Sequence, residues 1–352
     1  MSCQKYSRHF HYYFMNPITS PIIEVKEITR TFRSLKKEKG WKGIFRSLFK
    51  PHYTSYAALK GVSFQLEKGS FNGLIGENGA GKTTLLKMLA GLIPPTSGKA
   101  TVLGEIPFHR SFSFRSQIAL IMGQKAQLWW DLPAIDAFDL IRAIYEIPKP
   151  IYQKRLCILS QLLEVQPHLQ TQLRRLSLGE RMKMEFIGAL LHWPQVIFLD
   201  EPTIGLDVLA AHRLREFLKD FNQKEKSTII LTSHNMDDIE RLCSKVLILK
   251  AGQLVYDGEA SHLMKKEQKK LKIHFTHSLS LEELVKITHL FPHQIAFQEK
   301  ETRIVNFHLH QKQIPSVLQS LIQKAEIIHI NIEEESLESI IQRFYLESKS
   351  TS

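Results

Sequence analysis

Short apolar runs recur along the first two thirds of the chain, and amphipathic stretches separate them. Four of these runs have the length and composition of parallel strands that are buried on both faces. They cover residues 71–75, 196–199, 228–231 and 246–249. Helical patterns lie between them, for example at 181–191 and 211–222, and partial strand patterns come before them at 22–32 and 62–66. Strands that alternate with helices predict an α/β fold whose ligands bind at the carboxyl ends of the strands.

The pattern changes after about residue 262, where a lysine-rich stretch leads into alternating short strand and helix patterns. The expected elements are a strand at 272–275, a helix at 281–290, a strand at 303–309, a helix at 314–324, a strand at 327–332 and a helix at 335–345. They predict a separate small α+β domain over 261–352.

The segment 33–55 is a basic insert between the first two strand patterns, with Glu38 as its single acidic residue. Its apolar residues fall at helical spacing on one stripe: Trp41, Ile44, Phe45, Leu48 and Phe49. Such a helix can lie on a membrane surface, dock on a membrane partner or pack on its own domain, and the pattern leaves these readings open. No function is predicted for the N-terminal tail, residues 1–20.

Composition narrows the class of protein. The chain has 352 residues, 43% of them hydrophobic, which is enough for one large domain and a smaller one. No stretch approaches the ~18 consecutive apolar residues of a membrane helix, so we expect that the chain does not span a bilayer by itself. The isolated cysteines and scattered histidines form no metal-ligand spacing. The formal charge of +12 attracts either nucleic acid or an anionic membrane surface, or serves solubility alone.

A glycine-rich loop follows the apolar run 71–75 and precedes a helical pattern. Its residues are Gly76, Asn78, Gly79, Ala80, Gly81, Lys82, Thr83 and Thr84, with Glu77 between the first two. Glycines let backbone N–H groups turn toward phosphates, the helix N-terminus adds partial positive charge, and lysine adds a full one. The Thr83 hydroxyl is placed to ligate Mg²⁺. The loop predicts that the protein binds ATP or GTP.

Two carboxylates, Asp200 and Glu201, close the apolar run 196–199, and Pro202 follows them. Downstream of a phosphate-binding loop, such a pair suits phosphoryl transfer. Asp200 would hold Mg²⁺ through water, and Glu201 would act as general base on the attacking water.

The chain resembles the ATP-binding cassette (ABC) ATPases. Leu176-Ser177-Leu178-Gly179-Glu180 is similar to the family's signature motif and lies ahead of Asp200, as that family requires. The resemblance covers about 22–260. Leu178 and Glu180 depart from the usual glycine and glutamine of the motif.

The resemblance assigns further residues to the site. Gln124 matches the Q-loop glutamine, which binds nucleotide and Mg²⁺, Asp207 the D-loop, and His234 the switch histidine that contacts the γ-phosphate. Phe32 is the best candidate for the aromatic ring that stacks on adenine, with Tyr53 and Tyr56 as alternatives.

The resemblance also implies a fold and an assembly. A cassette over 21–260 would hold a mainly parallel sheet, N-terminal antiparallel strands and a helical subdomain at about 124–180. Ser177 and Gly179 would act on ATP bound by a second ATPase subunit, so a head-to-tail dimer, homodimeric or heterodimeric, would close over two ATP molecules.

Among ABC proteins, the chain looks like the ATPase subunits of bacterial ABC-2-type exporters, a group that includes drug- and viologen-exporter-like members. That likeness rests on the paired Trp129 and Trp130 after Gln124, the 33–55 insert and the segments 176–183 and 200–207. The two tryptophans would form a pocket for the permease, because aromatic residues often anchor a partner; core packing is the alternative. The implied partner is a separate transmembrane permease, at the cytoplasmic face of the plasma membrane. The alternative is the ATPase of an importer with a C-terminal regulatory domain. A nucleic-acid ATPase is less favoured, because no reader motif accompanies the charge.

Overall fold

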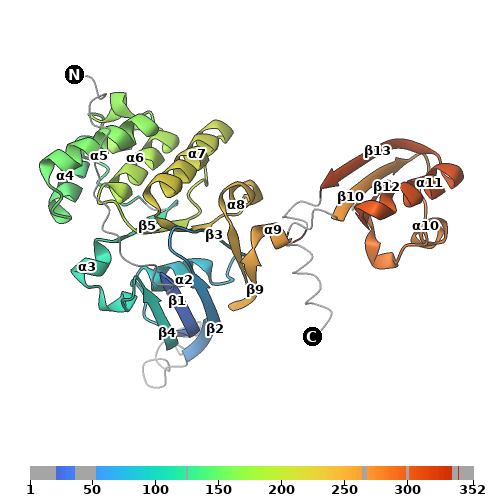
Figure 1. Ribbon diagram of the computed structural model, residues 1–352, viewed down its shortest axis with the longest axis horizontal. Helices are drawn as coiled ribbons and strands as arrows, with labels where there is room; N and C mark the ends of the chain where they lie inside the picture. The colour runs from blue at the N-terminus through green and yellow to red at the C-terminus, as the bar shows by residue number, and fades with distance from the viewer. Residues whose placement is uncertain are drawn as a thin grey trace, which may run out of the picture.

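The computed structural model describes residues 21–35, 53–123, 126–263, 268–298, 301–334 and 340. In these ranges the strands form three sheets of six, three and four strands (Figure 1). The expected α/β class is confirmed.

The six-stranded sheet carries the predicted apolar runs. Its strands are β3 (Phe71–Gly76), β5 (Ile118–Met122), β6 (Val196–Asp200), β7 (Thr228–Thr232), β8 (Lys245–Lys250) and β9 (Gln253–Glu259). They lie in the order β5-β6-β7-β3-β8-β9, parallel except for the last, which is antiparallel to β8. The carboxyl ends of β3, β6 and β7 therefore meet at one edge.

Both faces of the five parallel strands are buried, which explains why these strands are mainly apolar; the antiparallel β9 alternates between exposed and half-buried positions. In β6, Ile197 and Leu199 belong to a core cluster on one face, whereas Val196 and Phe198 belong to a second cluster on the other face. Successive side chains of a strand point to opposite faces, so a strand covered on both sides has few positions for polar residues except at its end. Asp200 occupies that end.

An antiparallel sheet covers one of these faces together with α2 (Lys82–Leu89). It consists of β1 (Ile23–Leu35), β2 (Tyr53–Leu66) and β4 (Ser97–Val102), in the order β2-β1-β4. The first two strands are longer than expected, so both ends of the basic insert belong to a hairpin rather than to a helix. The predicted amphipathic stripe at 41–49 lies outside the described residues.

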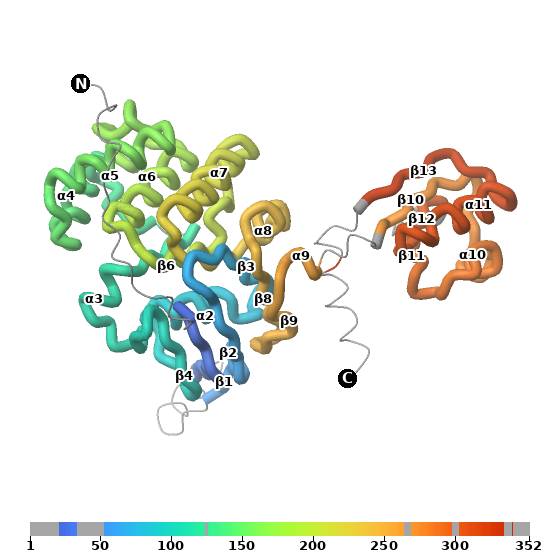
Figure 2. The backbone as a smooth tube through the Cα atoms, in the orientation of Figure 1, coloured from blue at the N-terminus to red at the C-terminus, as the bar shows by residue number. Residues whose placement is uncertain are grey.

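Helices cover the opposite face of the main sheet. They are α4 (Ala134–Ile144), α5 (Lys149–Leu162), α6 (Leu178–Leu190), α7 (Val208–Glu225), α8 (Met236–Leu242) and α9 (Ala260–Leu263). The short α3 (Phe112–Arg115) lies on the face of α2, because its Phe114 belongs to the same core cluster as α2 and the antiparallel sheet. Figure 2 shows α4, α5 and α6 grouped beside α7. The helices α6 and α7 begin three residues before the predicted starts, because Ser177 and Asp207 cap them. None of the described helices is long and apolar enough to cross a membrane.

The remaining sheet has its own core. Its elements are β10 (Gln268–Phe275), α10 (Leu281–Thr288), β11 (Ile295–Gln298), β12 (Glu301–His310), α11 (Ile314–Lys324) and β13 (Ile327–Glu334). The strand order is β11-β12-β10-β13, and all pairs are antiparallel. The sequence did not predict the four-residue β11. Of the helix expected at 335–345, only Ile340 is described, and it is buried in the core cluster that also holds α7 and α8.

The end of α6 is joined to β5 and α4 by a half-buried histidine. The ring of His192 stacks on Tyr145, with centroids 4.1 Å apart, and its Nε2 lies 2.8 Å from the carbonyl oxygen of Ile118. Burial lowers the pKa of His192 from 6.5 to about 4. The folded protein therefore keeps this ring neutral at a pH where the unfolded chain would protonate it.

This pKa shift predicts acid sensitivity. As the pH falls from about 6.5 to about 4, only the unfolded chain binds a proton at His192, so the free energy of unfolding should fall by up to ~3 kcal/mol. Urea unfolding across this range measures the loss. His192→Gln keeps an N–H donor for Ile118 but does not titrate, so its profile should be flatter; parallel profiles would contradict the assignment.

Candidate functional site

The glycine-rich loop joins the end of β3 to the start of α2. Gly81 has φ of 106°, and a Cβ there would lie 2.6 Å from the carbonyl oxygen of Ala58, so only glycine fits this turn. Gly79 also has positive φ, whereas no atom lies within 4 Å of the position of its Cβ. The loop thus rests against β2 at Gly81 and is open at Gly79.

Lys82 opens α2 with its side chain folded over this loop. Its ammonium donates hydrogen bonds to the carbonyl oxygens of Gly76 (2.6 Å) and Glu77 (3.2 Å), and the residue is buried. Burial lowers the pKa of Lys82, while the nearby Glu201 and Asp200 carboxylates oppose that shift. The loop, the ammonium and the two carboxylates therefore lie in one place.

Asp200 joins three elements. Its Oδ2 accepts a hydrogen bond from the Thr83 hydroxyl of α2, and its Oδ1 accepts one from the Thr232 hydroxyl of β7, both at 2.8 Å. The Thr232 hydroxyl in turn accepts the backbone N–H of Glu201 at 3.0 Å. The pair of Thr83 and Asp200 offers only oxygen donors, which fits Mg²⁺ when phosphate and water complete its coordination.

Glu201 and His234 face each other across the ends of β6 and β7. His234 Nε2 lies 2.8 Å from Glu201 Oε1. Glu201 has φ of 54°, in the left-handed region, and Gly123 packs so closely that a Cβ there would lie 2.1 Å from the Glu201 carbonyl oxygen. Gln124, the predicted Q-loop residue, lies outside the described residues.

Phe32, the best candidate for the adenine contact, is a neighbour of Tyr56, one of its two alternatives. Phe32 of β1 pairs directly with Tyr56 of β2, so the two side chains share one face. The guanidinium carbon of Arg30 lies 4.6 Å from the Phe32 ring centroid, and the Tyr56 hydroxyl donates to the Gly79 carbonyl oxygen at 2.9 Å. The hydroxyl thus ties this face to the phosphate-binding loop.

The signature residues contact a different part of the chain. Ser177 caps α6, and its hydroxyl and backbone N–H both donate to the Glu180 carboxylate, at 2.7 and 2.9 Å. These bonds lower the pKa of Glu180. Gly179 faces the start of α7: a Cβ there would lie 3.9 Å from Ala210 and 4.0 Å from Leu206, ordinary contact distances.

The other predicted residues of the loop and of the D-loop have local contacts. Asp207 caps α7 by accepting the backbone N–H of Ala210 at 2.8 Å. Asn78 is exposed, Ala80 is buried, and Thr84 is half-buried in the first turn of α2.

The tryptophan pair is exposed rather than packed in the core. Trp129 and Trp130 are 48% and 47% exposed, and the Arg181 guanidinium of α6 lies 4.6 Å from the Trp130 ring centroid. The preceding loop is held by Glu185, a buried carboxylate of α6 that accepts the backbone N–H groups of Gln127 and Leu128 at 3.0–3.2 Å. Its burial raises the pKa of Glu185.

Sequence reasoning missed a buried network beside the Glu201–His234 pair. Asp238 of α8 is fully buried, and its Oδ2 accepts the hydroxyls of Thr203 (2.8 Å) and Ser233 (2.6 Å). Its Oδ1 accepts Arg215 of α7 at 2.6 Å. The available signal was the position of two hydroxyl residues next to recognised motifs: Thr203 two residues after Glu201, and Ser233 directly before His234.

Comparison with known proteins identifies this arrangement. A family model described as ABC transporter matches residues 59–204. The ABC transporter ATP-binding protein NatA of Bacillus subtilis (strain 168) is 31% identical over 211 residues, which are 60% of this chain and 85% of NatA. The chain belongs to the ABC transporter family. It is an ATP-binding cassette ATPase, as the sequence predicted.

Other relatives of the cassette differ in length. The linearmycin resistance ATP-binding protein LnrL of the same organism is 28% identical over 80% of this chain and 90% of LnrL. Some curated relatives are much longer, and the chain covers 17% of the cholesterol transporter ABCA5 of Rattus norvegicus. A solved structure entitled "Structure of ATP binding subunit of ABC transporter" aligns with a TM-score of 0.58 at 27% identity, over 70% of this chain and 92% of the other.

The Asp238 network predicts a kinetic effect in this cassette. Thr203→Val and Ser233→Ala each remove one hydrogen bond to a buried carboxylate, a loss of ~1.5–3 kcal/mol, and should loosen the loop that carries Glu201 or His234. We expect kcat for ATP hydrolysis to fall about tenfold in each, with little change in KM.

Conservative variants provide the control. Thr203→Ser and Ser233→Thr retain the hydroxyls and should retain most of kcat. Both hydroxyls act on one oxygen, so the double variant should lose less than the product of the single effects. If melting temperature fell but kcat did not, the network would serve stability alone.

Proposed function

We propose that the chain hydrolyses ATP with Mg²⁺ as one half of a head-to-tail dimer, and that the dimer drives a separate ABC-2-type permease that exports its substrate. The observation that carries the proposal is the division of the site. The phosphate-binding loop, Asp200, Glu201 and His234 form one cluster, whereas Ser177 and Gly179 contact α6 and α7.

The first cluster can bind and orient the nucleotide. Backbone N–H groups at the start of α2 and the Lys82 ammonium would bind the β- and γ-phosphates. Thr83, Asp200 and Gln124 would hold Mg²⁺, which would neutralise charge that develops on the phosphates. Phe32 and Tyr56 would provide the adenine-facing surface, because their side chains share the face beside Gly79.

Glu201 and His234 would perform the chemical step. A carboxylate at hydrogen-bond distance from the attacking water can accept its proton and typically contributes ~10²–10⁴-fold. The His234 imidazole would contact the γ-phosphate and at the same time restrain Glu201, to which it is already joined at 2.8 Å.

The second half of the site would come from another subunit. The N-terminus of α6 offers backbone N–H groups and a partial positive charge, and Gly179 leaves its surface free of side-chain bulk. Asp207 lies at the start of α7, against which Gly179 packs, so it would lie at the same interface.

Export is favoured over import by two observations. The resemblance to ABC-2-type exporter ATPases rests on the tryptophan pair, the 33–55 insert and the segments 176–183 and 200–207. In addition, the relative LnrL is named for resistance to linearmycin.

Other features support docking on a membrane permease. Half-exposed tryptophans on a loop anchored to α6 by Glu185 suit a docking surface for a permease. The net charge of +12 fits an anionic membrane surface.

The dimer is tested with a trapped enzyme. Glu201→Gln removes the general base but keeps the shape of the side chain, so ATP hydrolysis should fall at least ~10²-fold while ATP still binds. Energy transfer between dyes on the cassettes of different chains should then rise when ATP is added. Near-parental hydrolysis in this variant would show that another group is the base.

Gly179→Ala in the same background separates the two halves. Inside one chain the added methyl group meets only ordinary contacts, and alanine favours a helix over glycine by ~0.5–1 kcal/mol, so the melting temperature should not fall. The ATP-dependent dimer should nevertheless be lost, because the methyl group would occupy the surface that meets the partner's nucleotide. An unchanged dimer would remove Gly179 from the interface.

The membrane partner is tested by affinity capture from native membranes. The parent should recover a six-helix-type permease without an extracytoplasmic binding protein, and Trp129→Ala with Trp130→Ala should recover it at least about tenfold less well, since aromatic anchors are worth more than 1–2 kcal/mol. Phe108→Ala, at another exposed aromatic residue, is the matched control. Recovery of an importer permease with its binding protein would reverse the proposed direction.

A further inference from the structure

The small antiparallel sheet has two edges of different character. The β11 edge is four residues long, whereas the β13 edge is eight residues long and contains neither lysine nor proline. In the described part of the chain, β13 pairs with β10 and with no other strand. Its two glutamates, Glu333 and Glu334, are confined to its last two positions. A long edge strand with no lysine, proline or charge in its earlier positions offers its backbone groups for pairing with another strand.

The β13 edge is also apolar. Ile330 and Ile332 stand opposite Ile273 and Leu271 of β10, which are fully buried, so all four side chains lie on the face that packs against the helices. Yet Ile330 is 37% exposed and Ile332 is 50% exposed. Two isoleucines on the core face of a sheet are therefore covered on one side only.

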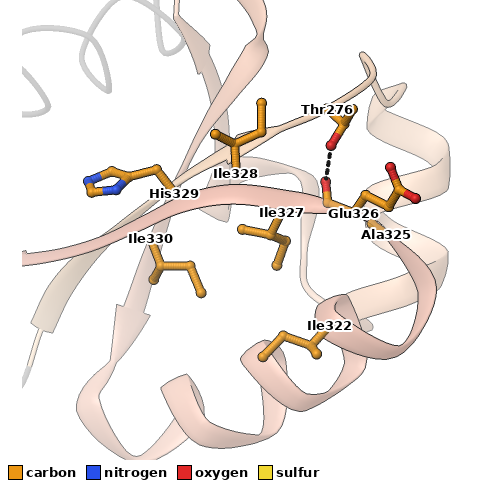
Figure 3. A pocket seen from close by; sticks show the side chains of 8 residues that line it. All are labelled: Thr276, Ile322, Ala325, Glu326, Ile327, Ile328, His329 and Ile330. Atoms are coloured by element: carbon orange, nitrogen blue, oxygen red, sulfur yellow. Dashed lines mark hydrogen bonds between the residues drawn. The ribbon is translucent and has the colours of Figure 1, made fainter.

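A hollow of about 740 Å³ extends this apolar edge at the start of β13 (Figure 3). Ile327 and Ile330 point to the side of α11, where Ile322 is 62% exposed, and Ile328, 58% exposed, points to the other side. Apolar side chains thus flank both sides of the strand, and a partner that added a strand here would cover them.

The sequence of the strand is complementary to itself. It reads His329-Ile330-Asn331-Ile332-Glu333. In an antiparallel pair centred on Asn331, Ile330 of one copy stands opposite Ile332 of the other on the core face, and His329 stands opposite Glu333 on the outer face. Apolar residues meet apolar residues and a base meets an acid, twice each, because a two-fold axis repeats every contact.

We propose that β13 pairs with β13 of a second copy of this chain about a two-fold axis at Asn331, which joins two four-stranded sheets into one continuous sheet. This contact does not depend on ATP. It goes beyond the dimer proposed for the cassettes, and it makes the small domain a permanent dimerisation element.

Cysteine cross-linking tests the contact and its register in the full chain, with Cys3 and Cys157 replaced by serine and without nucleotide. Asn331→Cys should form a disulfide-linked dimer on mild oxidation, because directly opposed residues have Cα atoms ~4.5–5.5 Å apart, within disulfide range. His329→Cys alone should not, since its copies would lie ~14 Å apart. A mixture of His329→Cys and Glu333→Cys chains should cross-link. Absence of both expected products, or equal cross-linking of all variants, would overturn the proposal.

Sedimentation of the nucleotide-free full chain gives the second test. Ile332→Lys places a charge in the paired edge of each copy and should raise the dimer dissociation constant at least about tenfold. Phe291→Lys, at a 68% exposed position of the same domain, is the control and should leave it unchanged. A parent chain that stays monomeric would overturn the pairing. The ATP-dependent dimer of Glu201→Gln is read separately, so either dimer can fail while the other stands.

Discussion

The hydrogen bonds that converge on the Asp200 carboxylate hold the candidate site together. Thr83 lies in the first turn of α2 and Thr232 ends β7, and both donate to oxygens at the end of β6, so three elements meet at one residue. A carboxylate at this position is tolerable because it lies where the buried sheet ends and two hydroxyls satisfy it. The sheet is apolar on both faces, so its carboxyl edge is where polar chemistry can be placed. Lys82, Glu201 and His234 all lie at that edge for the same reason.

Much of this edge could be predicted from sequence, because each part is local. The glycine-rich loop, the Asp200–Glu201 pair and the apolar strands are patterns of neighbouring residues, and their order along the chain carries the family resemblance. The Asp238 network could not be predicted in the same way. Its donors come from the end of β6, the end of β7 and the middle of α7, and only folding brings them to one carboxylate. The missed strand β11 has a different cause: four residues are too few to show a period.

The aromatic contact shows a further limit of the sequence. Phe32 and Tyr56 are separated by the basic insert, and whether they meet depends on the register of β1 and β2, which bulges shift at three places. The structure pairs them directly. Phe32 and one of its two predicted alternatives thus share one face of the sheet.

The two proposed dimer contacts differ in strength and timing, and the difference has a consequence for the cassette. Closure over ATP requires two chains to meet in one orientation, which costs translational and rotational entropy each time. With a permanent β13 pair, this entropy is lost only once, when the pair forms, since linked partners then meet at an effective concentration that can reach millimolar. The α6 surface could then bind ATP weakly and release it quickly. The Ser177 hydroxyl already donates a hydrogen bond to the Glu180 carboxylate. Exchanging this charged acceptor for a phosphate oxygen of ATP yields little net free energy. We therefore expect the signature segment to bind ATP weakly. The sheet edge would therefore provide the lasting association, and ATP would provide the switch.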